Sequence, residues 1–261
     1  MVQRAPELHE ISDFLDTLLD TASVPDYPGA LNGLQVECRG AVRRVAAAVD
    51  ASLETIEKAI ASRAQLLVVH HGLFWGGTQR ITGRFYSRVE RLITGGLAVY
   101  SAHLPLDLHP VLGNNVLLAR ALGLTPSGGF ARYQNIFVGV SGEADIATED
   151  IAERLAAHAR TQGGAIVVSG DVSGHRTRRW AICSGAGASS DSLREASSLG
   201  VDTLIVGEGP HHTAIEAREL GIVVLYGGHY ATETFGVCAL GAELERRFGL
   251  PWSFIEAPSG L

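Results

Sequence analysis

Two adjacent histidines follow a short apolar segment and offer the clearest metal-binding chemistry in the sequence. Residues 66–69 are Leu-Leu-Val-Val, the composition of a buried parallel strand, and His70 and His71 come directly after them. Ligands bind beyond the carboxyl ends of strands in open α/β sheets, and imidazole is the commonest metal ligand. Because side chains alternate along an extended backbone, two neighbouring histidines would most easily serve two different ions. A pair of histidines hydrogen-bonded in a loop is the alternative.

Two further pairs of candidate ligands follow later predicted strands. His103 and Asp107 come after one strand, and His229 and Glu233 come after another. The second pair is spaced by four residues at the start of a predicted helix. This spacing puts the two side chains on one helix face, with Cβ atoms about 6 Å apart. An ordinary surface pair has the same spacing, so it does not by itself establish a metal site.

Taken together, the candidate ligands are three imidazoles and two carboxylates, a donor set suited to zinc, iron or manganese. They are His70, His71, Asp107, His229 and Glu233. A sheet would bring these strand ends to a common edge, where a carboxylate can bridge two ions. Two ions about 3.5 Å apart clamp a hydrolytic substrate and lower the pKa of a bridging water. His103 would then be a partner of the ligands or the catalytic proton carrier.

Composition sets the class of protein. The chain has 261 residues, 46% hydrophobic content and a mean hydropathy of +0.15, which predicts a soluble globular protein of one large or two smaller domains. The formal charge of -7 argues against nucleic-acid binding. Three separated cysteines indicate neither a disulfide framework nor a thiolate zinc site. We expect a cytoplasmic protein, because neither a signal peptide nor an apolar run of about 20 residues is evident.

Apolar spacing predicts strands and helices in alternation, which is typical of the α/β class. Residues 25–38 are expected to form a loop that leads into an early strand, and the predicted strands after it are 45–49, 66–69, 97–100, 136–140, 165–168, 180–183, 203–206 and 222–226. The predicted helices are 8–19, 52–62, 85–93, 113–122, 148–160, one from about 191, 213–220 and 229–248. Thr148 is the expected N-cap of one helix, and Thr213 with Glu216 the expected capping box of another. Residues 170–179 are expected to form a surface loop or hairpin.

Three further segments allow two interpretations each. The aromatic loop 72–77 could wall a site or pack against the sheet edge, and packing is the commoner outcome. Residues 184–188, rich in glycine and alanine, lie between a strand and a helix. They could cradle a phosphate, but they lack the P-loop lysine and a complete GxGxxG, which favours a tight turn. His211 and His212 precede a predicted helix and could be either capping-region residues or ligands.

The motifs resemble those of the GTP cyclohydrolase I type II homologue family, the NIF-three-like dinuclear-metal proteins. The resemblance rests on His70-His71-Gly72, Ser101-Ala102-His103 with Asp107, Gly228 to Glu233, Asn32 to Val36, Asn114-Asn115 and Gly207-Glu208. These motifs span nearly the whole chain in the family's order. One departure concerns the pocket wall: Gly72-Leu73-Phe74 stands where many members have a proline-containing loop.

The resemblance implies a two-lobed α/β protomer with mixed sheets flanked by helices, assembled as a toroidal homohexamer. An N-terminal lobe, 1–126, would carry His70, His71 and Asp107. A second segment, 127–261, would return from about residue 222 to complete a dinuclear metal site between the N- and C-terminal segments. Two divalent ions per chain, zinc, iron or manganese, are implied, with the five ligands named above.

The implied function is a dinuclear-metal-dependent hydrolase acting on a nucleotide-like small molecule. Nominally this is GTP ring opening, in which a metal-bound hydroxide attacks C8 of the purine and His103 moves protons. Hydrolysis of a phosphoester or another amide-like bond by the same ions is a related possibility. The alternative is a non-enzymatic metal-binding ring that regulates other proteins or serves as their scaffold, because a fold does not fix a reaction.

Overall fold

The computed structural model describes residues 4–261, which separate into two compact units, each with its own sheet. Unit 1 contains the described residues up to His109 together with Gly236–Ala257. Unit 2 contains Pro110–Phe235 and Pro258–Leu261. Both sheets are mixed and flanked by helices, which confirms the expected α/β class. No helix within residues 4–261 combines the length and apolar character needed to cross a bilayer.

The division between the units differs from the expected boundary at residues 126 and 127. Unit 2 begins at Pro110 and runs to Phe235, and the chain rejoins unit 1 at Gly236. The physical reason is the packing of helix α5 (Asn114–Ala121), whose Leu118 lies in the apolar core of unit 2. Burial of that apolar face assigns the helix to unit 2.

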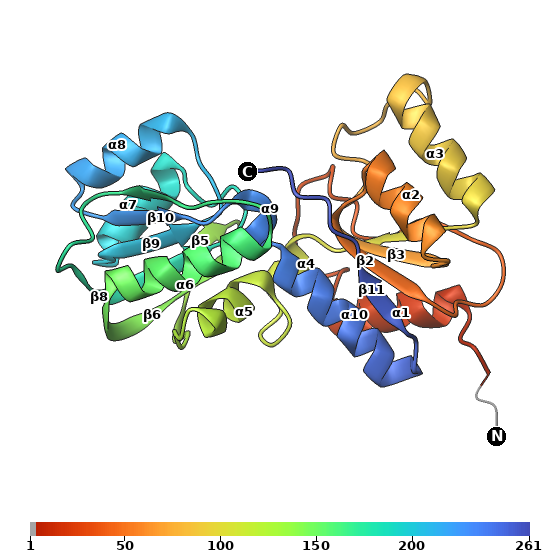
Figure 1. Cartoon of the computed structure of the whole chain (residues 1–261), viewed down its shortest axis with the longest axis horizontal. Helices are drawn as coiled ribbons and strands as arrows, with labels where there is room; N and C mark the ends of the chain where they lie inside the picture. The colour runs from red at the N-terminus through yellow and green to blue at the C-terminus, as the bar shows by residue number, and fades with distance from the viewer. Residues whose placement is uncertain (1–3) are drawn as a thin grey trace. The chain divides into compact units, whose positions relative to one another are not determined.

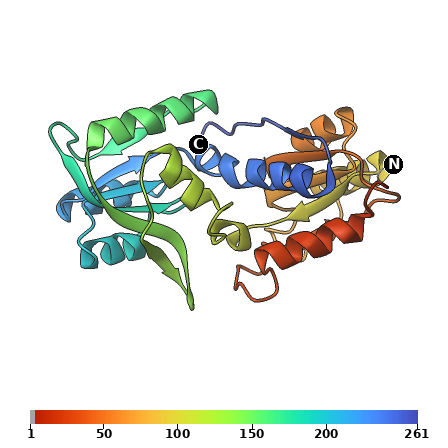
Figure 2. The same cartoon turned by 90° about the horizontal axis from the view of Figure 1, so that it is seen from below.

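The sheet of unit 1 has the strand order β1-β4-β3-β2-β11, in which β1 is antiparallel to β4 and the other neighbours are parallel. Its strands are β1 (Gly33–Val36), β2 (Val45–Asp50), β3 (Leu66–His71), β4 (Ala98–Ser101) and β11 (Trp252–Phe254). Its helices are α1 (Leu8–Leu19), α2 (Leu53–Ala61), α3 (Gly83–Gly95), α4 (Leu104–Asp107) and most of α10 (Thr234–Phe248). Helices α2 and α3 cover one face, and α1 and α10 cover the other (Figures 1 and 2).

Strand β3 is buried from Leu66 to His70 because helices cover both faces of the sheet, which explains its uninterrupted apolar sequence. It pairs in parallel with β2 and β4, so the predicted parallel strand is confirmed. The register between β2 and β3 places Asp50 directly beside His71. The sheet therefore sets a carboxylate next to one of the predicted ligands.

The sheet of unit 2 has the strand order β5-β6-β8-β9-β10-β7, in which β8, β9 and β10 are parallel. Its strands are β5 (Gly128–Tyr133), β6 (Ile136–Ala147), β7 (Val167–Ser169), β8 (Arg176–Cys183), β9 (Thr203–Val206) and β10 (Val223–Tyr226). Besides α5, its helices are α6 (Thr148–Thr161), α7 (Ser190–Ser198), α8 (His211–Glu219) and α9 (His229–Thr232). One core packs α7 and α8 on the sheet, and another packs α5 and α6 on its other face (Figure 1).

At the starts of helices α8 and α6, the described residues do not form the caps that the sequence predicted. Helix α8 begins at His211 with Pro210 as its N-cap, so the capping box of Thr213 and Glu216 does not form. The Thr213 hydroxyl instead donates to the Pro210 carbonyl oxygen, at 2.7 Å, and Glu216 accepts from the hydroxyl of Ser190. The two side chains are thus used by other partners.

Helix α6 shows the same kind of difference. Its N-cap is Ala147, and Thr148 is its first helical residue. The Thr148 hydroxyl is buried and hydrogen-bonded to His175 and Thr177, at 2.7 and 2.8 Å. The segment 170–179, expected as a surface loop or hairpin, includes the start of strand β8.

A buried tyrosine joins the sheet of unit 1 to helix α1. The Tyr100 side chain is fully buried, and its hydroxyl donates to Asp16 Oδ1 at 2.8 Å. Burial and the Asp16 carboxylate raise the pKa of Tyr100, which keeps the hydroxyl protonated as a donor. We predict that Tyr100→Phe lowers the free energy of unfolding by about 1–2 kcal/mol in urea denaturation, because Asp16 loses this donor.

The matched control is Tyr86→Phe. Tyr86 is 49% exposed, and its hydroxyl also donates to a carboxylate, that of Glu90, at 2.7 Å. An exposed carboxylate can replace a lost donor with water, so the free energy of unfolding should change by no more than about 0.5 kcal/mol. Equal losses in the two variants would contradict a special role for the buried bond.

Candidate metal centre

Three imidazoles meet at the carboxyl end of the unit 1 sheet. His70 and His71 end strand β3, and His103 follows β4 as the N-cap of α4. One ring nitrogen from each lies within 4.8 Å of those of the other two. The ring centroid of His70 is 4.8 Å from that of His71 and 4.9 Å from that of His103. Three nitrogen donors are thus close enough to bind a metal ion.

The rings that end β3 are each held through Nδ1. His70 Nδ1 donates to the carbonyl oxygen of Ala102 at 2.8 Å, and His71 Nδ1 lies 2.9 Å from Asp50 Oδ1. A carbonyl oxygen can only accept, so Nδ1 of His70 carries the proton. An acceptor on one nitrogen fixes the tautomer and leaves the lone pair on Nε2, the arrangement usual for metal-binding histidines.

His103 is held by a network that starts from Asp26. His103 Nδ1 lies 2.8 Å from Asp26 Oδ1, and the His103 backbone N–H donates to Asn32 Oδ1 at 2.7 Å. Asp26 Oδ2 accepts from the Asn32 side chain and from the Leu104 N–H. Burial alone would raise the pKa of Asp26, but His103 and the other donors lower it below its ordinary value. Asp26 is therefore an ionised anchor for His103.

Asp107 completes the group that unit 1 brings together. It is the last residue of α4 and is 5% exposed, and its Oδ2 lies 3.5 Å from His70 Nε2. Its backbone N–H donates to the His103 carbonyl oxygen, which closes the short helix. The predicted residues His70, His71 and Asp107 are thus close neighbours, with His103 among them.

The loop after His71 is attached to strand β1 through Gln35. The Leu73 N–H donates to Gln35 Oε1 at 2.8 Å, and Gln35 Nε2 donates to the carbonyl oxygens of Ala30 and Leu31. A Cβ atom on Gly72 would overlap the Gln35 amide, so glycine is needed at this close approach. The Asn-Gly-Leu-Gln motif therefore supports the loop that follows the histidines.

Unit 2 holds the remaining two predicted ligands. His229 begins α9 and Glu233 is its C-cap, and His229 Nε2 lies 3.1 Å from Glu233 Oε2. His229 Nδ1 lies 2.7 Å from Glu208 Oε1, a third instance of an imidazole held by a carboxylate. Burial lowers the pKa of His229, but the two carboxylates outweigh it and raise that pKa to about 9. The predicted pair therefore shares one face, as expected from its spacing.

The turn at residues 184–188 is used inside unit 2. The Ser184 N–H donates to Asn115 Oδ1 at 2.8 Å, and the Gly185 N–H donates to Thr232 Oγ1 at 3.0 Å. These donors are therefore engaged by side chains, which favours the structural turn over a phosphate-binding loop.

Gly185 also lies against the ligand pair of unit 2. Its φ is +62°, and a Cβ atom there would overlap Glu233 Oε1 and come within 3.2 Å of His229 Nε2. A side chain would both strain the backbone and displace the two groups. The glycine in this turn is thus explained by its closeness to the candidate ligands.

Sequence analysis did not predict that Asp26, Asp50 and Glu208 hold imidazoles, although Gly207-Glu208 was among its motifs.

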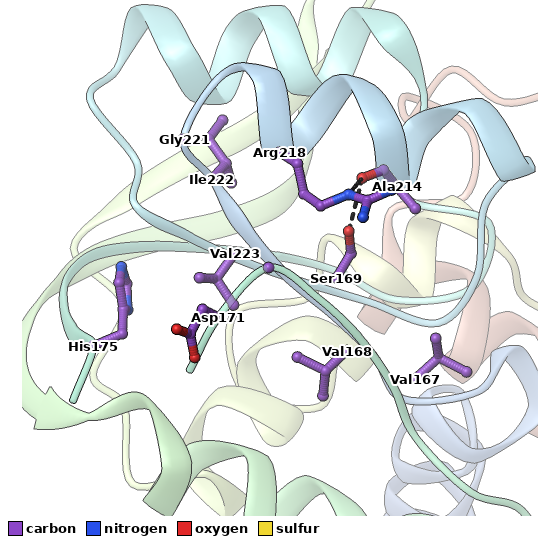
Figure 3. Close-up of a pocket in the computed structure, with 11 residues that line it drawn as sticks. Val167, Val168, Ser169, Asp171, His175, Ala214, Arg218, Gly221, Ile222 and Val223 are labelled. Atoms are coloured by element: carbon purple, nitrogen blue, oxygen red, sulfur yellow. Dashed lines mark hydrogen bonds between the residues drawn. The ribbon is translucent and has the colours of Figure 1, made fainter. Parts of the chain in front are cut away.

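Two other features lie apart from the candidate ligands. His211 and His212 are exposed at the start of α8 and, among the described residues, belong to no group of three candidate ligands. A cavity of about 770 Å³ in unit 2 is bordered by β7, β10 and the end of α8 (Figure 3). It is lined by residues such as Ser169, Asp171 and Arg218, and none of the predicted ligands lines it.

The sequence matches the family model Duf34/NIF3 (NGG1p interacting factor 3) over residues 6–259. A Deinococcus radiodurans protein named GTP cyclohydrolase 1 type 2 homolog is 42% identical over 97% of this chain and 94% of its own. A Halobacterium salinarum protein of the same name is 43% identical over 97% of this chain and 100% of its own. The solved structure of protein ybgI, of unknown function, has a TM-score of 0.86 at 32% identity, covering 98% of this chain and 100% of that one. Reduced HcgD from Methanocaldococcus jannaschii has a TM-score of 0.83 at 26% identity, with the same coverage.

The contact between Glu208 and His229 predicts a measurable effect on metal affinity. We expect Glu208→Gln to weaken binding of Zn²⁺ by about 10- to 100-fold in competition with a chelator, because the neutral amide holds the imidazole less firmly. Glu216→Gln removes the same charge from a carboxylate that accepts from Ser190 instead, and should leave the affinity unchanged. Equal affinities for all three proteins would contradict the positioning role of Glu208.

His158 predicts a dependence of stability on pH. Its Nε2 donates to the carbonyl oxygen of Ala231 at 2.8 Å, and its ring stacks on Phe235 with centroids 4.3 Å apart. Burial lowers the pKa of His158 below 6.5, although the hydrogen bond opposes this shift. Because the pKa of His158 is lower in the folded than in the unfolded protein, the stabilisation by its neutral ring is complete above pH 6.5. It is lost as the pH falls through the pKa that His158 has in the folded protein.

The test compares wild type with His158→Gln in urea denaturation at pH 8 and at pH 5. The variant is expected to be less stable at pH 8, and the difference should shrink at pH 5, where protonation penalises only the wild-type protein. A difference that stays constant or grows in acid would show that the pKa of His158 is not lowered.

Proposed function

Because the chain belongs to the Duf34/NIF3 family, we propose that it is a dinuclear-metal-dependent hydrolase acting on a nucleotide-like small molecule. The observation that carries the proposal is the cluster of His70, His71 and His103, each with Nδ1 held by an acceptor. Held in this way, His70 and His71 are prepared to bind divalent ions through Nε2, and His103 lies beside them as a proton carrier. The name of the bacterial and archaeal relatives, GTP cyclohydrolase 1 type 2 homolog, supports a purine nucleotide as the substrate class.

The proposed ligands of two divalent ions, zinc, iron or manganese, are His70, His71, Asp107, His229 and Glu233. Imidazole nitrogens and carboxylate oxygens form a donor set that suits these metals. Unit 1 supplies two imidazoles and a buried carboxylate, and unit 2 supplies an imidazole and a carboxylate that is 3% exposed. The toroidal homohexamer implied by the resemblance stays a prediction.

In the proposed reaction, His103 transfers the proton. Two bound divalent ions would polarise the substrate and lower the pKa of water, which makes hydrolysis feasible near neutral pH. His103 accepts a proton at Nε2, while the ionised Asp26 holds Nδ1–H and stabilises the imidazolium that forms. Asp50 keeps His71 in the orientation that presents Nε2. Opening of the imidazole ring of GTP is the nominal reaction of this class.

The proposal is tested with metal-loaded protein and a panel of GTP, other nucleotides and generic phosphoesters. We expect turnover by wild type, none in the double variant His70→Ala/His71→Ala, and a loss of about 100-fold or more in His103→Gln with its metal content retained. Elemental analysis reports metal content independently of activity.

The chain offers a matched control in a second pair of adjacent histidines. His211→Ala/His212→Ala removes two exposed imidazoles from α8 and should leave both turnover and metal content unchanged. Wild-type activity no higher than that of His70→Ala/His71→Ala would overturn the hydrolase and favour the non-enzymatic metal-binding protein. A metal content unaffected by replacing both His229 and Glu233 would overturn the ligand set.

A further inference from the structure

Two partly exposed aromatic side chains lie beside His103 in unit 1. Tyr27 is in the turn that follows Asp26, and Trp75 is in the glycine-flanked loop after His71. The ring centroids of Tyr27 and Trp75 are 6.4 Å apart, and those of Trp75 and His103 are 4.7 Å apart, with the rings edge to face. Tyr27 is 49% exposed and Trp75 is 39% exposed. Two partly exposed aromatic rings thus lie next to the proposed proton carrier.

In the aromatic loop 72–77, some side chains pack in the core and one lies beside the histidine cluster. Phe74 packs on Phe85 in the core of unit 1, with ring centroids 5.9 Å apart, and Leu73 is buried. Trp75, the next residue, instead lies against the histidine cluster and stays partly exposed. Packing therefore explains Leu73 and Phe74, but core burial does not explain Trp75.

Backbone contacts fix the two loops that carry these rings. The Tyr27 N–H donates to Asp26 Oδ1 at 2.7 Å, the same oxygen that holds His103. A Cβ atom on Gly29 would come 2.9 Å from the Trp75 carbonyl oxygen, so the two loops pack backbone against backbone. Because Asp26 binds both the Tyr27 backbone and the His103 ring, the segment that carries Tyr27 is held beside the proposed proton carrier.

We propose that Tyr27 and Trp75 form a stacking site for the heteroaromatic base of a nucleotide, an inference that rests on the proposed function. Aromatic faces bind planar rings by stacking, with little dependence on the identity of the base. Stacking on aromatic faces needs a planar ring, which the base has and the phosphates lack, so the base is the part of the nucleotide that belongs on this surface.

The test measures binding of guanosine, which has a base but no phosphate, to the metal-loaded protein by equilibrium dialysis. We expect Tyr27→Ala and Trp75→Ala each to weaken binding by about 5- to 100-fold, the usual effect of removing one stacking partner. Trp75→Phe keeps an aromatic face and should retain most of the affinity. Trp75→Leu keeps apolar bulk without that face, so it tests stacking even if Trp75→Ala fails to fold.

Tyr86→Ala is the matched control, because Tyr86 is also 49% exposed and lies on α3, outside the histidine cluster. It should bind guanosine like wild type, and all variants should keep the wild-type metal content. Ribose 5-phosphate, which has a phosphate but no base, is the second probe. Its binding should be weaker and should not change in Trp75→Ala.

The outcomes separate the stacking site from the hydrolase. If guanosine binding depends on Tyr27 and Trp75 but no nucleotide is turned over, the stacking site stands and the hydrolase fails. If nucleotides are hydrolysed and neither alanine variant raises KM, the hydrolase stands and the stacking site is overturned. Absence of guanosine binding by wild type, or equal binding by Trp75→Leu and wild type, also overturns the stacking site.

Discussion

An imidazole presents one nitrogen to a metal ion reliably only when an acceptor holds its other nitrogen, and this constraint governs the candidate ligands within each unit. Every predicted histidine of the site meets it through Nδ1. The pairs are His70 with Ala102, His71 with Asp50, His103 with Asp26 and His229 with Glu208. One acceptor comes from a strand and three come from loops, so segments that carry no proposed ligand determine how the ligands point.

At two points the backbone comes so close to these polar groups that only glycine fits. Gly72 lets the loop after the histidines reach the Gln35 amide, and Gly185 lets a turn lie against His229 and Glu233. Around them the sheets are apolar, with β3 and β10 buried over most of their length. Rigid apolar strands with polar ends limit the reorganisation needed when an ion or substrate binds.

The strand ends could be predicted from sequence because short apolar runs are local signals, and the approach of His229 to Glu233 follows from helix geometry. The acceptors could not be predicted in this way. Asp50 meets His71 through the register of β2 and β3, and Asp26 meets His103 across 77 positions of sequence. Such pairings depend on tertiary contacts, as does the assignment of α5 to unit 2. Local sequence patterns therefore predict neither these pairings nor the unit to which α5 belongs.

The chain order has a consequence for folding during synthesis. Unit 2 is inserted in the sequence between α4 and the later part of unit 1, so all of it except residues 258–261 is made before β11. Strand β11 pairs with β2, whose N–H at Val45 donates to the Pro251 carbonyl oxygen. Until about 200 further residues have been added, β2 is therefore an unprotected sheet edge. A nascent chain is consequently open to pairing with another chain at β2, after unit 2 has already acquired its core.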